Sequence, residues 1–393
     1  MDGCGHVRHY ILTYIDIEGI FISTNINMIE SWLMTLTKEH STPRAAGSMS
    51  FLDRWLAAWI FLAMAAGLLI GKVFPGIGAL LSAVEIGGIS IPIAIGLIFM
   101  MYPPLAKVRY DKTKEITTDR TLMVVSIMLN WIVGPALMFS LAWLFLPDQP
   151  ELRTGLIIVG LARCIAMVLV WSDLACGDRE ATAVLVAINS VFQILMFGVL
   201  GWFYLQILPS WLGLDTTSVT FSVVSIVTSV LVFLGIPLVA GVLSRVIGEK
   251  TKGRRWYEDT FLPKISPLAL IGLLYTIVLL FSLQGDEITA QPWTVARLAL
   301  PLLMYFVGMF FISLVVSKLS GLTYERAASV SFTAAGNNFE LAIAVSIGTF
   351  GATSPQALAG TIGPLIEVPV LVGLVYVMLW LGPKIFKKEN AGS

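Results

Sequence analysis

The sequence predicts an all-α, polytopic membrane protein of ten transmembrane helices in two inverted five-helix repeats, with broken fourth and ninth helices at the centre. Three observations support this: the composition, ten apolar runs of spanning length, and a likeness between the two halves of the chain. Of the 393 residues, 57% are apolar and 13% are charged, whereas soluble domains carry about 25% charge. The 25 basic and 25 acidic residues cancel, which argues against nucleic acid as a partner.

The apolar runs locate the predicted spans. A bilayer core of about 30 Å requires roughly 20 apolar helical residues. Ten runs meet this need: 55–74, 88–106, 122–146, 154–174, 181–208, 220–243, 265–283, 298–317, 327–350 and 357–381.

Lysine and arginine predict the orientation, because short loops rich in them stay in the cytoplasm. With the N-terminus inside, most of these residues lie in inner loops and the tail, whereas Lys72, Arg153 and Arg297 lie outside. Both termini are therefore expected in the cytoplasm. We expect the inner or plasma membrane of the cell, although a vacuolar membrane suits the same charge pattern.

The N-terminal segment 1–48 stands apart from the spans. Its apolar stretch 11–22 is short and contains Asp16 and Glu18, so it predicts neither a span nor a signal peptide. The segment is either a cytoplasmic extension or lies upstream of a translation start at Met49. The expected organisation is an extension over 1–48, five-helix repeats over 49–208 and 209–383, and a cytoplasmic tail over 384–393.

The second half of the chain resembles the first at a nearly constant offset. Gln193 then lies over Glu367, and Cys164 over Glu340. An offset that crosses five spans gives the halves opposite senses in the membrane, which is typical of secondary transporters with a site near the midplane. Apolar helices also align by chance, but several pairings at nearly one offset favour duplication.

Polar side chains at membrane depth are costly and tend to face a partner or a cavity. The predicted fourth, fifth, ninth and tenth spans supply them: Arg163, Cys164, Asn189, Ser190, Gln193, Asn337, Asn338, Glu340 and Glu367. Gly336 before two asparagines predicts a break in the ninth span, which must line a cavity or pack on protein. Gly363-Pro364 predicts freed carbonyls in the tenth.

Each of these features has a purely structural interpretation as well. Arg163 and Glu340 could neutralise each other, the asparagines and prolines could be kinks, and a buried cysteine usually packs as a small apolar residue. Cys164 differs from that norm because the neighbouring Arg163 favours the thiolate, which is nucleophilic and binds metals.

Two kinds of residue pattern are missing from the predicted spans, and their absence limits the possible energy sources and metal-binding chemistry. The sequence contains no Gly-x-x-x-x-Gly-Lys-Ser/Thr loop, so transport is expected to be coupled to an ion or driven by a separate ATPase subunit. The histidines His6, His9 and His40 all lie in the segment 1–48, which excludes a histidine relay or metal site in the membrane. No cofactor is expected.

Three long motifs resemble the arsenical-resistance family of arsenite efflux permeases. The first is Gly160-Leu161-Ala162-Arg163-Cys164-Ile165-Ala166-Met167-Val168, followed by Trp171 and Asp173-Leu174-Ala175-Cys176-Gly177-Asp178. The others run from Phe332 to Ala344, with Gly336-Asn337-Asn338-Phe339-Glu340 at the centre, and from Gly363 to Val370. The likeness extends from about Met49 to Lys388; the N-terminal extension departs from it.

The resemblance implies a ten-helix member of the bile acid, arsenite and riboflavin transporter superfamily that exports arsenite, and often antimonite, in exchange for protons. The family's essential cysteine falls on Cys164 and its essential glutamate on Glu340. Trivalent arsenic is soft, so one thiolate is a natural contact that still permits release. The expected substrate-binding residues are Cys164, Glu340, Asn337, Asn338 and Arg163, with arsenic(III) on Cys164 as substrate and not as a resident metal.

Glu340 and Glu367 are the expected proton carriers, because desolvation favours a neutral carboxyl group. If Arg163 pairs with Glu340, it opposes this effect, so a partner exchange is expected during transport. A sodium-coupled carrier of organic anions on the same fold is the main alternative, although sodium ions do not bind sulfur ligands and Cys164 would then have no role. A membrane enzyme with Cys164 as nucleophile lacks a base or cofactor motif, and a passive channel remains a third candidate.

Overall fold

The computed structural model describes residues 56–74, 76–77, 84–86, 89–108, 119–165, 167–214, 223–290, 292–351 and 353–386. The predicted extension over 1–48 lies outside these ranges, as does the tail after Phe386. All contacts reported below belong to the unit that spans Ala57–Ser393.

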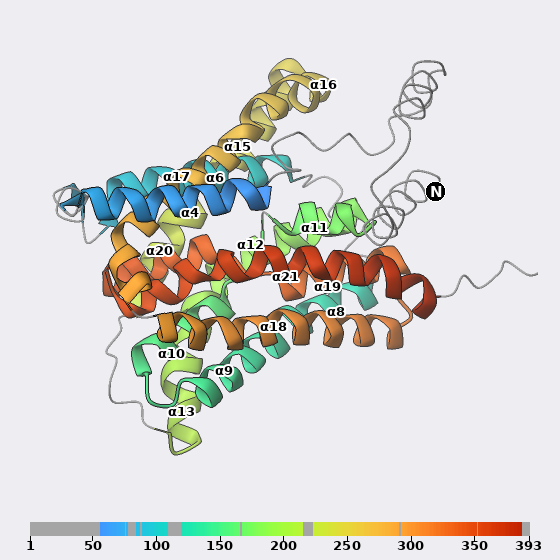
Figure 1. Cartoon of the computed structure of the whole chain (residues 1–393). Helices are drawn as coiled ribbons and strands as arrows, with labels where there is room; N and C mark the ends of the chain where they lie inside the picture. The colour runs from blue at the N-terminus through green and yellow to red at the C-terminus, as the bar shows by residue number, and fades with distance from the viewer. Residues whose placement is uncertain are drawn as a thin grey trace, which may run out of the picture. The chain divides into compact units, whose positions relative to one another are not determined.

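Helices dominate the described residues (Figure 1). The α-helices are α4 Leu56–Val73, α6 Ile91–Lys107, α8 Arg120–Met128, α9 Gly134–Phe145, α10 Pro150–Leu161, α11 Val168–Leu174, α12 Arg179–Trp202, α13 Leu208–Trp211, α14 Val223–Val230, α15 Ile236–Lys252, α16 Arg254–Trp256, α17 Leu262–Ala290, α18 Pro292–Leu319, α19 Tyr324–Ala335, α20 Phe339–Phe350 and α21 Pro355–Ile385. Single π-helical turns join consecutive helices: η1 Leu129–Val133, η2 Phe203–Ile207, η3 Leu231–Gly235 and η4 Tyr257–Phe261. Two strands of two residues each, β1 Glu85–Ile86 and β2 Ile89–Ser90, pair antiparallel; the all-α prediction omitted them.

Six helical segments among the described residues are long and apolar enough to cross a membrane: Arg120–Phe145, Arg179–Trp211, Val224–Lys252, Arg254–Leu283, Pro292–Leu319 and Pro355–Gly382. Large apolar side chains on them face outward, such as Ile132, Leu195 and Val239. Lipid is as apolar as these side chains, so such exposure has no cost in a bilayer. The predicted polytopic membrane protein is confirmed.

The predicted fourth and ninth spans are each two helices. The first is divided into α10 and α11, and the second into α19 and α20, which stop and restart at Ala335 and Phe339. The interruption at Gly336 therefore lies where the sequence predicts it. Asn338 then starts α20, because its Oδ1 accepts a hydrogen bond from Leu341 N at 3.0 Å.

The predicted tenth span is one helix, since α21 runs without interruption through Gly363 and Pro364. Gly363 is instead a packing position: a Cβ atom there would overlap the ring of Phe339. The glycine thus lets α21 lie close against the first residue of α20.

Gly363→Ala is expected to destabilise the protein strongly, because the added methyl group has no space beside the Phe339 ring. Overpacking of this kind costs about 1–3 kcal/mol. Melting of the purified protein in detergent measures it. Gly373→Ala on the same helix is the control, since a Cβ atom there meets nothing within 4 Å. Equal melting temperatures of the two variants would contradict this packing role.

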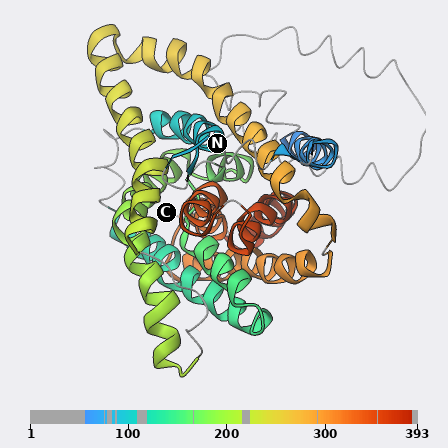
Figure 2. The same ribbon diagram turned by 90° about the vertical axis from the view of Figure 1, so that its left-hand side faces the viewer.

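Glycine also lets a first group of helices pack closely. In α6 and α17, a Cβ atom on Gly272 would lie 2.8 Å from the carbonyl oxygen of Gly96. On α4, a Cβ atom at Gly67 would lie 2.7 Å from the Phe281 Cβ of α17. Figures 1 and 2 show α4 beside α17 from two directions. Helix α15 packs on the other side of α6, through Gly241.

The remaining long helices pack mainly on one another. Helix α18 packs on α9, α19 and α21, whereas α10 packs on α9, α20 and α21. Helix α14 contacts α12 and α20 and continues through η3 into α15, which links the two groups. The interrupted helices α10, α19 and α20 all lie within this second group.

Two arginines that the sequence predicts on the non-cytoplasmic side bind the end of α9. Arg153 donates to the carbonyl oxygens of Leu146 and Pro147 at 3.1 and 2.9 Å, and Arg297 donates to that of Phe145 at 3.0 Å. Cations are favourable at a helix C-terminus. Arg297 also pairs with Asp148 and holds the pKa of that carboxyl group at about 2, below its usual value.

Candidate functional site

The two interruptions cross each other. Arg163, which follows α10, forms an isolated antiparallel bridge with Asn337, which follows α19. Asn338 N donates to the carbonyl oxygen of Ala162 at 2.9 Å. The backbone outside the helices thus finds hydrogen-bond partners within the protein, as it must at membrane depth.

Each crossing segment is also held by a side chain from the following long helix. Arg163 N donates to Gln193 Oε1 at 3.1 Å, and Asn337 N donates to Glu367 Oε1 at 3.2 Å. In both pairs the acceptor is 30 residues beyond the donor. The two pairs are therefore related by one and the same offset, which takes 163 to 337 and 193 to 367.

This geometry refines the sequence alignment. Gln193 and Glu367, which the alignment places over each other, make matching contacts. At the crossing itself, however, Arg163 corresponds to Asn337, whereas the alignment places Cys164 over Glu340 at a slightly larger offset. The first segment is longer, extending from Leu161 to Val168 instead of from Ala335 to Phe339, so one offset cannot fit both sides of the interruption.

Cys164 lies in the extended segment next to Arg163 and is 2% exposed. The opposite segment comes close: a Cβ atom on Gly336 would lie 3.1 Å from Cys164 Cβ and 3.3 Å from Glu367 Oε1. The absence of a side chain at Gly336 therefore leaves room for both the thiol and the carboxyl group.

Arg163 is fully buried, and its guanidinium group points to α18. Its Nη1 donates to Tyr305 Oη at 2.6 Å. Within the part of the chain that the structure describes, its Nε and Nη2 atoms have no hydrogen-bond partner. No ion pair among the described residues joins Arg163 to Glu340, so the structural pair considered from the sequence is absent from this structure.

The two asparagines are buried at the crossing, 2% and 1% exposed. Asn337 Oδ1 and Nδ2 lack hydrogen-bond partners in the described ranges, and so does Asn338 Nδ2. Together with Arg163 Nε and Nη2, five buried polar atoms on the two segments are unpaired there. Each such atom costs about 1–3 kcal/mol unless a polar group binds it. The cluster is therefore suited to a small molecule with several hydroxyl groups.

Two carboxyl groups flank the same segment. Glu340 lies in the first turn of α20 and is partly exposed. A carboxylate is favourable there because helix N-termini carry positive partial charge. Glu367 on α21 is 5% exposed and accepts from Asn337 N at 3.2 Å. The structure thus brings together all six candidate residues around the crossing.

Sequence reasoning gave no role to Gln193 or Tyr305. Gln193 was visible as a polar residue in an apolar span and as the equivalent of Glu367, but its contact with Arg163 N was not. Tyr305 gave no signal, because a single tyrosine in the apolar helix α18 is ordinary. Asn130 on the π-helical turn η1 was also missed; it accepts from Asn189 Nδ2 at 3.5 Å.

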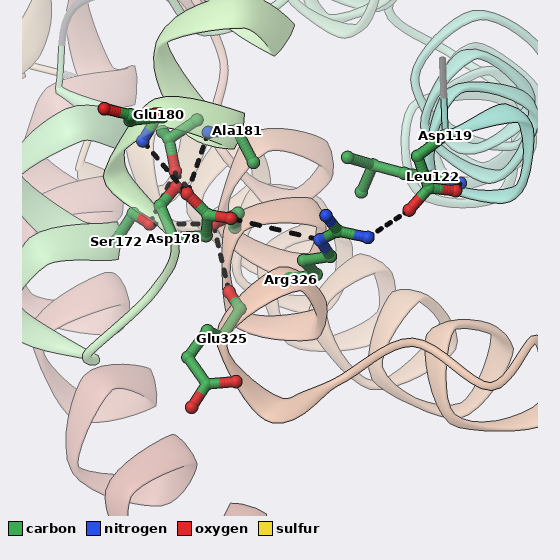
Figure 3. Close-up of polar contacts among 10 residues, drawn as sticks. Asp119, Leu122, Ser172, Asp178, Glu180, Ala181, Glu325 and Arg326 are labelled. Carbon is green, nitrogen blue, oxygen red and sulfur yellow. Dashed lines mark hydrogen bonds and ion pairs between the residues drawn. The ribbon is translucent and has the colours of Figure 1, made fainter. Parts of the chain in front are cut away.

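A second polar cluster joins the ends of α8, α11, α12 and α19 (Figure 3). Asp178 starts α12, where its Oδ1 accepts from Glu180 N and Ala181 N, both at 3.0 Å. Arg326 lies between Asp119, with which it forms an ion pair, and Asp178 Oδ2 at 3.9 Å. Asp178 and Arg326 thus join the ends of α8, α12 and α19.

Comparison with known proteins gives a consistent result. The model of the Sodium Bile acid symporter family matches residues 94–291. An arsenical-resistance protein Acr3 of Corynebacterium glutamicum is 75% identical over 354 residues, covering 90% of this chain and 96% of that protein. An uncharacterized transporter of Synechocystis is 35% identical over 84% of this chain and 89% of its own length. A second Acr3 protein, from Alkaliphilus metalliredigens, is 33% identical over 83% of this chain and 92% of its own length.

Proposed function

This chain belongs to the arsenical-resistance family within the bile acid, arsenite and riboflavin transporter superfamily, and from that premise we propose that it exports arsenite from the cytoplasm in exchange for protons. It is a membrane transporter and not an enzyme. The relatives named as arsenical-resistance proteins Acr3 support arsenite as the cargo, and antimonite, which is chemically related, is proposed as a second cargo.

The observation that carries the proposal is the set of unpaired polar atoms beside a thiol at the helix crossing, among the described residues. Arsenite at neutral pH is mainly the uncharged trihydroxide of a soft, thiophilic centre. The Cys164 thiol displaces one hydroxyl group of arsenite, which leaves as water with the thiol proton as the As–S bond forms, since soft ligands prefer soft centres. The amides of Asn337 and Asn338 donate to or accept from the remaining hydroxyl groups, and the guanidinium group of Arg163 donates to them. A single thiol keeps the complex weak enough to release.

Glu340 and Glu367 carry the coupled protons. Glu367 accepts a hydrogen bond from the backbone of Asn337, which also binds substrate. A carboxylate accepts more strongly than a protonated carboxyl group, so proton binding at Glu367 loosens the segment that holds the cargo. Glu340, close after Asn338 in the chain, acts on the same segment. Proton and arsenite occupancy therefore oppose each other, as antiport requires.

Alternating access involves two inverted five-helix repeats, 49–208 and 209–383, in a ten-span protein with both termini in the cytoplasm. The equivalent contacts of Gln193 and Glu367 support the duplication. The protein acts in the inner or plasma membrane of the cell.

Purified protein in detergent tests both cargo and coupling. Arsenite binding is expected to release protons into a weakly buffered solution, which a pH-indicator dye detects, because binding favours the ionised carboxyl groups. Sodium is expected to leave arsenite affinity unchanged.

The main rival is a sodium-coupled organic-anion carrier. It gains support if Na⁺ tightens binding of an organic anion and arsenite releases no protons. In that case Glu340 and Glu367 are sodium ligands.

A further inference from the structure

Gln193 makes the contact on the first crossing segment that Glu367 makes on the second. Arg163 N cannot bond within α10, because that helix ends at Leu161 and the chain is extended at Ala162, with φ −82° and ψ 107°. A backbone N–H without an acceptor is unfavourable at membrane depth, where no water replaces the missing partner. Gln193 Oε1 supplies the missing acceptor at 3.1 Å.

We propose that Gln193 is a positioning residue, which fixes the extended backbone at Arg163 and thereby sets where the Cys164 thiol meets arsenite. This inference rests on the proposed function of the crossing as an arsenite site. Gln193 does not need to touch the substrate in order to act, because Cys164 is the residue directly after the one it holds.

The side chain of Gln193 is itself fixed by its surroundings, as a positioning residue must be. It is fully buried, and its Nε2 donates to the carbonyl oxygen of Asn189 at 3.3 Å. Asn189 Oδ1 in turn accepts from Trp131 Nε1, on the π-helical turn η1, at 3.2 Å. A continuous set of hydrogen bonds thus runs from η1 to the segment that carries the thiol.

The two equivalent acceptors differ in one chemical respect. The carboxyl group of Glu367 can take up a proton, whereas the amide of Gln193 stays neutral at physiological pH. The thiol therefore lies on a segment whose attachment is constant, and Asn337 lies on one whose attachment depends on protonation. Of the two matching hydrogen bonds, the one to Gln193 is independent of pH, whereas the one to Glu367 depends on protonation of its carboxyl group.

Arsenite dissociation constants of purified variants in detergent test the proposal. Gln193→Met keeps the size of the side chain but removes the acceptor, and it is expected to weaken binding about tenfold. Gln193→Glu restores an oxygen and is expected to stay within about threefold of the wild type. Gln206→Met makes the same change at an exposed position of the adjoining turn η2 and is expected to have no effect.

A double-mutant cycle separates positioning of the thiol from general stability. In a Cys164→Ser background, Gln193→Met is expected to cause little further loss, because the two residues act through one contact. An equal penalty with and without the thiol, or wild-type affinity in Gln193→Met, overturns the proposal.

If the wild type binds no arsenite, the proposed function fails. The positioning role of Gln193 is then tested by amide hydrogen exchange of residues 161–165. Exchange is expected to be faster in Gln193→Met than in Gln206→Met, and equal exchange in the two variants shows that Gln193 does not fix this backbone.

Discussion

Cys164→Ala is expected to abolish arsenite transport, with affinity falling by roughly 100-fold or more, where each tenfold is about 1.4 kcal/mol. The thiol is the one soft ligand in the cluster, and oxygen and nitrogen atoms do not replace sulfur at a soft centre. The fold should persist, because the change removes a single buried atom. Arsenite binding to the purified protein and arsenic retention in cells both measure the effect.

Ser190→Ala is the matched control for this change. It also removes one buried γ atom near the crossing, but Ser190 Oγ donates only to the carbonyl oxygen of Val186 on its own helix, at 2.8 Å. This variant is expected to transport like the wild type. Undiminished arsenite flux in Cys164→Ala would mean that the thiol is only packing.

Glu367→Gln is expected to uncouple transport from the proton gradient while leaving the protein folded. An amide oxygen can still accept from Asn337 N, as Gln193 does for Arg163 N in the other half. The amide cannot release a proton, however, so arsenite should equilibrate across the membrane without accumulating. Arsenite binding to this variant is expected to release fewer protons than binding to the wild type.

Glu367→Leu provides the comparison, because it removes both the proton and the acceptor. It is expected to lower stability as well as transport, since Asn337 N is then buried without a partner. If Glu367→Gln still accumulates arsenite at the wild-type level when a pH gradient is imposed, Glu367 is excluded as a coupling residue. Glu340 is then the remaining candidate of the two.

The sequence predicts the interruption of the ninth span well, because its cause is local. Glycine followed by two asparagines is a poor helix former, and Asn338 is a favourable start for the next helix. Gly363-Pro364 is an equally poor helix former by sequence, yet α21 continues through it. The function of Gly363 is to make room for the Phe339 ring, which is a fact of tertiary packing and not of local preference.

The partner of Arg163 could not be predicted from the sequence. Opposite charge favours Glu340, but the guanidinium group bonds to Tyr305 Oη on α18, and two of its nitrogen atoms remain unpaired among the described residues. The choice depends on which helix lies beside α10, and apolar helices carry little information about their neighbours. That the candidate residues lie together was nevertheless predictable, because a polar residue in a bilayer is rare and tends to face other polar groups or a cavity.

Arsenite uptake into everted membrane vesicles, with and without an imposed proton gradient, tests the central claim most directly. Vesicles carrying the wild type are compared with those carrying Cys164→Ala or Glu340→Gln. We expect gradient-dependent accumulation in the wild type, almost no uptake in Cys164→Ala, and no gradient-driven accumulation in Glu340→Gln. Wild-type arsenite uptake that is unchanged when the proton gradient is collapsed would contradict proton antiport at this crossing.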